Sequence, residues 1–405
     1  MVIKNTRPSY PRRGPSCLLV LFVLFGISVA AFVMVNAEEV RDTIIPTPIP
    51  TATRSATEYA LLADISEKNQ EFAEAIDYYQ TAIRLDATNP EFFIRLINLL
   101  VQEGRPEEAI TAAEQVTILA PDNDRVWTAV AAAYLANGDR LGDTGDNAGA
   151  SLQYAQAFQA AREAFTLNPE NATAYAYAAG GLVLQGNPDR YDQALEYADY
   201  AVLLEPNNPW ARLYMGTVFV YLGRYTDAIA QYQFGIEANA NIATLYYNLG
   251  YNFYAVSQVP DAILMFEQAI AIDPDYGAAY DGLAHMYLQL GENPLAEENA
   301  LRAVELNPNM ARAHGRLGEA YYNQNNYPEA IKELEIAADL YGEPNDLNGR
   351  FFYFLAQSYL RSDPDQYCRT AVPLFEAVSQ AAPAWAPFAQ EGIEECRLAT
   401  LGTAP

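Results

Sequence analysis

A pattern of large apolar residues, then small residues, then a proline recurs along most of the chain. The copy at 243–276 is formed by Tyr246, Leu249, Gly250, Phe253, Ala262, Phe266, Ala269 and Pro274. The copy at 277–310 repeats it 34 residues later, at Tyr280, Leu283, Ala284, Tyr287, Ala296, Ala300, Ala303 and Pro308. Spacings of three and four residues place side chains on one helix face, so each copy predicts two packed amphipathic helices. The proline ends the second helix and turns the chain into the next copy.

The order of these residues resembles the tetratricopeptide repeat, whose pattern is W-x2-L-G-x2-Y, then A-x3-F, then P. About nine copies follow one another over residues 56–383, with an insertion near 137–150 that we expect to form a solvated loop. The resemblance implies an all-α fold, a right-handed α-solenoid of helix-turn-helix repeats. A final helix over 384–401 is expected to cap the exposed end of the stack.

A different pattern occupies the N-terminus, where residues 17–35 carry no charge. A helix of that length spans roughly 28 Å, which is close to the thickness of a bilayer core. Four Lys and Arg lie in residues 1–16, so we expect one transmembrane helix with a cytoplasmic basic N-terminus and an extracytoplasmic body. A signal peptide cleaved after Ala37 is the alternative, and it would make the protein secreted. The Pro- and Thr-rich residues 38–55 predict an extended linker.

Composition excludes several functions. The formal net charge is −27, which argues against nucleic-acid binding because that needs a basic surface. The chain has two His and three Cys, and no nucleotide-binding, metal-binding or hydrolase motif is present. We therefore expect neither an enzyme nor a cofactor or metal site. The insertion contains several Asp, but their spacing does not match a calcium loop.

Two cysteines fall at the C-terminal end of the predicted stack. Cys368 begins the second helix of the ninth repeat, and Cys396 lies near the end of the capping helix. The start of one antiparallel helix lies beside the end of the next, so a disulfide between them is possible. The compartment expected for the body is oxidising, which favours it. Two free thiols are the alternative.

The resemblance also suggests where a partner would bind, because in this family the first helix of each repeat lines the concave groove. The positions assigned to that groove are Trp210, Tyr221, Tyr247, Asn248, Tyr251, Asn252, Tyr254, His285, Arg312, Tyr322, Arg350 and Tyr353. Three of the tyrosines, Tyr247, Tyr251 and Tyr254, form one stripe on a single helix. Tyrosine is frequent at binding hot spots, although some of these rings could simply pack against neighbouring helices. Asn248 and Asn252 could hold a peptide backbone through their amides.

The sequence thus favours a non-catalytic, membrane-tethered scaffold that binds a protein or peptide outside the cytoplasmic membrane, in assembly of an envelope complex. The alternative is a glycan- or cell-wall-binding module of a polysaccharide-export system, because tyrosine rings also stack on sugars. An intracellular regulator is a third reading. It would require the apolar N-terminal segment to pack against a partner. The oligomeric state cannot be read from the sequence.

Overall fold

The computed structural model describes residues 17–35 and 54–400, which contain 20 α-helices and one short 3-10 helix. The chain divides into two units, residues 1–55 and 56–405. The basic segment 1–16, the cleavage position at Ala37 and most of the 38–55 linker lie outside the described residues.

The first unit contains helix α1 (Cys17–Val35), over the uncharged segment. Its large apolar side chains from Val20 to Val35 are exposed. Within the described part of the chain, no helix meets the combined length and apolarity required of a membrane span. The structure therefore does not establish that α1 crosses a membrane, and the anchor stays a prediction.

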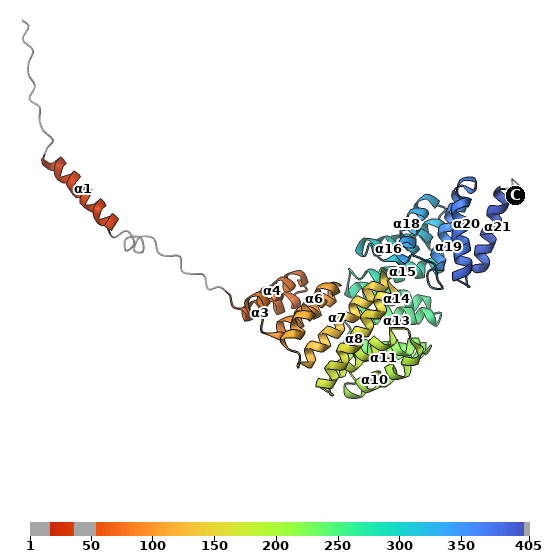
Figure 1. Cartoon of the computed structure of the whole chain (residues 1–405), viewed down its shortest axis with the longest axis horizontal. Coiled ribbons are helices and arrows are strands. Elements are labelled where there is room, and N and C mark those ends of the chain that lie inside the picture. The colour runs from red at the N-terminus through yellow and green to blue at the C-terminus, as the bar shows by residue number, and fades with distance from the viewer. Residues whose placement is uncertain (1–16, 36–53, 401–405) are drawn as a thin grey trace, which may run out of the picture. The chain divides into compact units, whose positions relative to one another are not determined.

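The second unit is an all-α solenoid in which residues 54–400 form nine helix pairs and a last single helix (Figure 1). The pairs are α3 (Ala56–Lys68) and α4 (Phe72–Leu85); α5 (Pro90–Gln102) and α6 (Pro106–Leu119); α7 (Asp124–Asp143) and α8 (Asn147–Leu167); α9 (Ala172–Val183) and α10 (Tyr191–Leu204), with η1 (Pro188–Arg190) between them; α11 (Pro209–Tyr221) and α12 (Tyr225–Ala238); α13 (Ala243–Ala255) and α14 (Val259–Ile272); α15 (Gly277–Leu290) and α16 (Asn293–Leu306); α17 (Ala311–Asn323) and α18 (Tyr327–Tyr341); and α19 (Gly349–Ser362) and α20 (Pro364–Ala381). The single helix is α21 (Ala386–Thr400).

Local sequence explains where many of these helices begin. Asn89 and Asn208 each precede a proline and accept a hydrogen bond from a backbone N–H of the first turn, at 3.0 Å from Glu91 N and from Trp210 N. Asparagine is among the best N-cap residues, and proline at the next position loses no helical hydrogen bond. These two Asn-Pro junctions are therefore helix starts, whereas Asn168 and Asn307, which also precede a proline, end α8 and α16.

The curvature of the stack follows from which helices meet. First helices of neighbouring repeats contact one another directly, from α5 with α7 through to α17 with α19. In the described residues no comparable contact joins the second helices of neighbouring repeats. A stack whose first helices converge curves towards them, so the first helices line its inner side and the second helices its outer side.

The insertion of the third repeat does not form the loop that we expected. It extends both helices, so that α7 has 20 residues and α8 has 21, and only a short turn separates them. Asn137 and Gly138 are buried inside the hairpin, and Tyr154 of α8 donates a hydrogen bond to Asp139 Oδ1 of α7 at 2.8 Å. These contacts across the two helices extend the packing beyond the usual length of a repeat.

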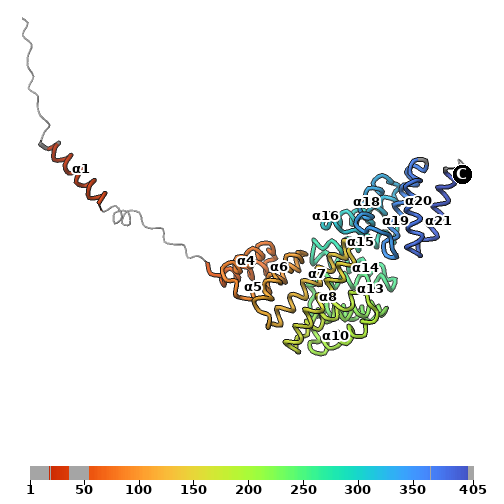
Figure 2. The backbone as a smooth tube through the Cα atoms, viewed as in Figure 1, coloured from red at the N-terminus to blue at the C-terminus, as the bar shows by residue number. Residues whose placement is uncertain are grey.

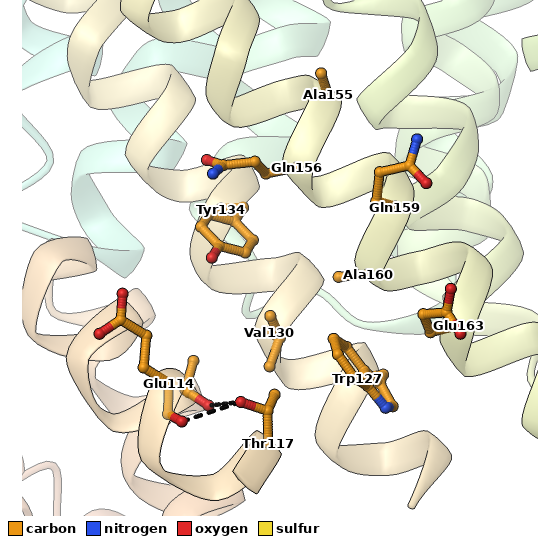
Figure 3. A pocket seen from close by; sticks show the side chains of 11 residues that line it. Glu114, Thr117, Trp127, Val130, Tyr134, Ala155, Gln156, Gln159, Ala160 and Glu163 are labelled. Atoms are coloured by element: carbon orange, nitrogen blue, oxygen red, sulfur yellow. Dashed lines mark hydrogen bonds between the residues drawn. The ribbon is translucent and has the colours of Figure 1, made fainter. Parts of the chain in front are cut away.

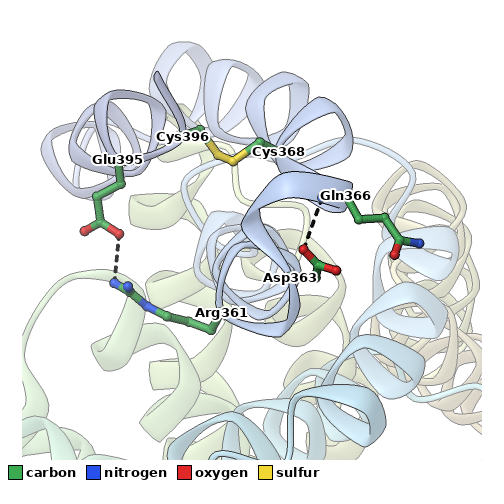
Figure 4. Close-up of a disulfide and its surroundings, with 6 residues drawn as sticks. All are labelled: Arg361, Asp363, Gln366, Cys368, Glu395 and Cys396. Carbon is green, nitrogen blue, oxygen red and sulfur yellow. Dashed lines mark hydrogen bonds and ion pairs between the residues drawn. A yellow bond between two sulfur atoms is a disulfide. The ribbon is translucent and has the colours of Figure 1, made fainter. Parts of the chain in front are cut away.

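The C-terminal helix covers the last repeat. Cys368 of α20 and Cys396 of α21 form a disulfide with a Cα–Cα distance of 5.5 Å, and both are buried (Figure 4). Arg361 and Glu395 add an ion pair at 2.9 Å between α19 and α21. Helix α21 is thus held by a covalent bond and by a contact with the first helix of the repeat that it covers.

Candidate functional site

The inner side of repeats six to eight carries a buried charge network. Its centre is Asp281 of α15, whose side chain is 0% exposed. Asp281 Oδ2 accepts a hydrogen bond from Arg312 Nε at 2.7 Å and forms an ion pair with Arg316 Nη1 at 2.6 Å, both on α17. Arg316 Nη1 also donates a hydrogen bond to the backbone oxygen of Asp281 at 2.5 Å. A buried carboxylate is tolerated only when it is paired, so this pairing fixes α15 against α17.

The tyrosines of α13 lie beside this network. Arg312 Nη2 donates to the Tyr247 hydroxyl at 3.4 Å, and Arg316 Nη1 donates to the Tyr251 hydroxyl at 3.3 Å. The rings of both tyrosines also pack against Phe266 of α14. Burial raises the pKa of both hydroxyls, so they remain protonated hydrogen-bonding groups.

Tyr254 and His285 form the next part of the same face. Their rings meet edge to face with centroids 4.9 Å apart. Burial lowers the pKa of His285 to about 2, assisted by the nearby cations Arg316 and Arg350, so the imidazole is neutral. We name this surface the inner face, defined by Tyr247, Tyr251, Tyr254, Asp281, His285, Arg312 and Arg316.

The two asparagines predicted to hold a peptide backbone are engaged within their own helix. Asn248 Nδ2 donates to Thr244 O and Asn252 Nδ2 donates to Asn248 O, each at 2.8 Å. Asn252 is also only 4% exposed. One N–H of each amide is therefore engaged by the carbonyl one turn earlier, and the expectation that these amides hold a peptide backbone stays a prediction.

The remaining predicted positions lie away from the inner face or contribute to packing. Trp210 packs edge to face with Tyr177 of α9, and Tyr221 packs edge to face with Tyr191 of α10. Tyr322 packs against Phe354 of α19. Trp210, Tyr221 and Tyr322 thus stabilise contacts between neighbouring helices. The predicted positions that the structure brings together are Tyr247, Tyr251, Tyr254, His285 and Arg312.

Two predicted positions lie on α19. Arg350 forms an ion pair with the buried Glu319 of α17. Tyr353 packs against Trp385 and Phe388, at the end of the stack that α21 covers. The half-buried Tyr353 therefore packs against α21 on one side, and Arg350 neutralises a buried acid.

One residue that contacts the inner face, Asp143, was not among the site positions predicted from the sequence. Asp143, at the end of α7, accepts a hydrogen bond through Oδ1 from Arg312 Nη1 at 2.5 Å, although the two are 169 residues apart. Gly145, in the turn after α7, lies against Leu340 and Tyr341 at the end of α18. Figure 2 traces the backbone through the successive helix pairs, from orange at α4 and α5 to blue at α20 and α21. Sequence offers no signal for this pairing, because it depends on the curvature of the four intervening repeats.

A second candidate site lies on the outer side, between the second helices α6 and α8. It is a cavity of about 480 Å³ whose floor is formed by Trp127, Val130 and Tyr134 of α7 (Figure 3). Glu114 of α6 and Glu163 of α8 also line it, together with the side-chain amides of α8. It opens where the second helices diverge, and it combines an apolar floor with polar edges.

In residues 17–35 and 54–400, no group of three or more His, Cys, Asp or Glu residues is placed to hold a metal ion. The charged residues of the inner face are instead paired with one another.

Comparison with known proteins agrees with this geometry. Residues 68–133, 213–277 and 282–343 match sequence models of the family described as tetratricopeptide repeat. The chain carries tetratricopeptide repeats. The matched stretches fall in the first three repeats and in repeats five to eight. A search of curated proteins finds no match.

One solved structure shows a similar fold. The APC/C hetero-tetramer Cut9-Hcn1 aligns with a TM-score of 0.57 and 17% identity, covering 76% of this chain and 57% of that chain. Yeast Tom70 aligns with a TM-score of 0.42 and 16% identity, covering 85% of this chain and 88% of Tom70. The pilF protein of Pseudomonas aeruginosa aligns with a TM-score of 0.48 and 17% identity, covering 55% of this chain and 98% of pilF. At these identities the likeness to Cut9-Hcn1 concerns the tetratricopeptide fold alone, and the other two carry no argument.

Proposed function

We propose that the protein is a non-catalytic tetratricopeptide scaffold that binds a protein or peptide partner on its inner face. The observation that carries this proposal is the gathering of three tyrosines, a neutral histidine and two arginines on consecutive first helices. Tyrosine and arginine are the residues most enriched at binding hot spots. Tetratricopeptide domains in general bind proteins or peptides, which supports the same reading.

Membrane tethering is the second part of the proposal. The uncharged helix α1 and the basic residues before it support an anchor that holds the repeats outside the cytoplasmic membrane, in an envelope complex. Protease added to intact spheroplasts should then digest the repeats, and alkaline carbonate should leave the chain in the membrane fraction. Protection of the repeats from the protease would contradict the orientation, and extraction by carbonate would contradict the anchor.

Site-specific photo-crosslinking tests the partner. A photoreactive phenylalanine analogue placed at Tyr254, on the inner face, should capture a protein partner in intact cells. The matched control places the analogue at Tyr225, which is 39% exposed at the start of the second helix α12. We expect a discrete crosslinked protein from position 254 and none from position 225. Equal capture at both positions, or capture at 225 alone, would contradict binding on the inner face.

Glycan binding is a second candidate because of the outer cavity. Aromatic rings such as those of Trp127 and Tyr134 stack on sugar rings, while Gln156, Gln159 and Glu163 offer hydrogen bonds to hydroxyl groups. Purified full-length protein should then bind cell-wall material that has been treated with protease, and Tyr134→Ala should weaken this binding. Binding that disappears after the protease treatment would contradict the glycan alternative.

A further inference from the structure

The tip of the α7–α8 hairpin, residues 140–149, holds the last turn of α7, a short turn and the start of α8, although its sequence favours helix poorly. Gly142 lies within α7, yet outside the backbone of its own helix no atom lies within 4 Å of the position that a Cβ would take there. Glycine is a weak helix former, and packing does not require it at this position. Gly145 adopts a φ of +87° in the turn that follows. The ordered tip therefore depends on what it docks against more than on its own helix propensity.

The docking surface is the inner face of repeats six to eight. Arg312 uses Nε for Asp281 and Nη1 for Asp143, so the tip completes the partners of a guanidinium that already belongs to the network. A Cβ added to Gly145 would lie 3.1 Å from Leu340 O, which shows how closely the tip backbone approaches the end of α18. Arg312 and Asp143 are each 23% exposed in their side chains, so the pair is mostly shielded from water.

Docking also has an electrostatic cost. Burial, together with the like charge of Asp281, raises the pKa of Asp143 against the opposing effect of Arg312. The carboxylate therefore loses hydration when the tip docks, and the ion pair compensates only in part. The tip has low helix propensity, and the ion pair only partly offsets the burial of its carboxylate. Both properties favour reversible local opening of the tip.

We propose that the hairpin tip is a latch that covers the inner face and is held closed by the Asp143–Arg312 ion pair. Opening frees the last turns of α7 and the first turns of α8 and uncovers Arg312, Tyr247 and Tyr341. The latch itself needs no partner. Its role as a gate for a partner rests on the proposed function.

Hydrogen exchange of the full chain tests the latch. Asp143→Asn removes the charge at nearly constant shape, and Asp146→Asn is the matched control on the same tip. Asp146 caps α8 by accepting from Gly149 N at 2.8 Å, and asparagine caps a helix equally well. We expect amides of residues 140–149 to exchange at least tenfold faster in Asp143→Asn and at the wild-type rate in Asp146→Asn. Amides of α3–α6 should not change in either variant.

Two results would overturn the proposal. Unchanged exchange at the tip of Asp143→Asn would mean that the ion pair does not hold it. An equal acceleration in α3–α6 and at the tip would mean that Asp143 stabilises the whole stack and does not act locally.

Thiol labelling provides an independent measurement. A cysteine in place of Tyr341 lies under the tip, and a cysteine in place of Tyr225 is the outer control, both in a Cys17→Ser background with the native disulfide intact. A bulky maleimide should label position 341 at least tenfold faster when Asp143→Asn is added, and position 225 at the same rate. Labelling at 341 that Asp143→Asn does not accelerate would overturn the latch. Neither measurement uses a partner, so failure of the proposed function would leave both results unaffected.

Discussion

Gly181 of α9 offers the sharpest test of the helix packing. A Cβ at this position would lie 2.7 Å from Phe158 N and 2.8 Å from Tyr154 O, both in the backbone of α8. Backbone atoms cannot rotate away as the end of a side chain can. Gly181→Ala therefore forces α9 and α8 apart, since ordinary contact begins at 3.4 Å.

The required movement is about 0.7 Å, from 2.7 Å to 3.4 Å. It would be transmitted to Tyr154, whose ring lies against Gly138 of α7. Overpacking of this kind costs about 1–3 kcal/mol, and a clash with backbone belongs at the upper end. The higher helix propensity of alanine stabilises α9 by about 1 kcal/mol and offsets part of this cost. We expect a net loss of about 2 kcal/mol in the free energy of unfolding.

The matched control is Gly142→Ala, the same substitution in a helix where the added Cβ meets open space. It should stabilise α7 locally by up to about 1 kcal/mol. Urea unfolding of the two full-length variants, with hydrogen exchange to locate the change, should show a difference of about 3 kcal/mol centred on α7–α9. If Gly181→Ala is as stable as Gly142→Ala, then α8 and α9 do not approach as closely as described.

Three further predictions concern single interactions. Cys396→Ser should cost about 3–4 kcal/mol of local stability in α21, because the disulfide with Cys368 closes a 28-residue separation, and exchange of α21 amides measures it. Glu333 accepts a hydrogen bond from His314, which lowers the pKa of Glu333. The ionised Glu333 therefore stabilises the folded state fully above the ordinary pKa of glutamate, and this contribution is lost as pH falls through the lowered pKa. The free energy of unfolding of Glu333→Gln, measured between pH 3 and 7, should therefore be lower than that of wild type at neutral pH and approach it in acid. A difference that stays constant with pH would refute this reasoning. Tyr79→Phe removes a hydrogen bond from a buried hydroxyl to a carboxylate of α3 and should cost about 1 kcal/mol in a urea titration, whereas an unchanged midpoint would show that this bond contributes nothing.

The helix pairs could be predicted because their pattern is local. Residues such as Phe266 and Ala269 recur at helical spacing, and Asn-Pro junctions mark helix boundaries, as starts at Asn89 and Asn208 and as ends at Asn168 and Asn307. The insertion was misread for the same reason. Gly138 and Gly142 indicate a loop when only local propensity is considered. Packing against Tyr154 and docking across the stack override that preference.

The candidate site could be predicted only in part. Repeat register placed Tyr247, Tyr251 and Arg312 on the same side of the first helices of repeats six and eight, and Arg312 does reach Tyr247. Register could not show that Asn252 would turn back to its own helix, because that depends on a rotamer. It also could not show that Asp143 reaches Arg312, since the distance between repeats three and eight is set by small rotations that accumulate along the stack.

That contact between distant repeats changes how stability is distributed along the chain. Each repeat of an open solenoid contacts only its neighbours, so its stability is a sum of local terms and unfolding can begin at either end. While the latch is closed, the Asp143–Arg312 contact joins repeat three to repeat eight and makes a ring of six repeats. Closing the ring requires two segments 169 residues apart to meet, which adds a late, non-local step to folding. Repeats one and two and the capped ninth repeat lie outside the ring and keep the linear behaviour, and opening the latch returns the six repeats to it.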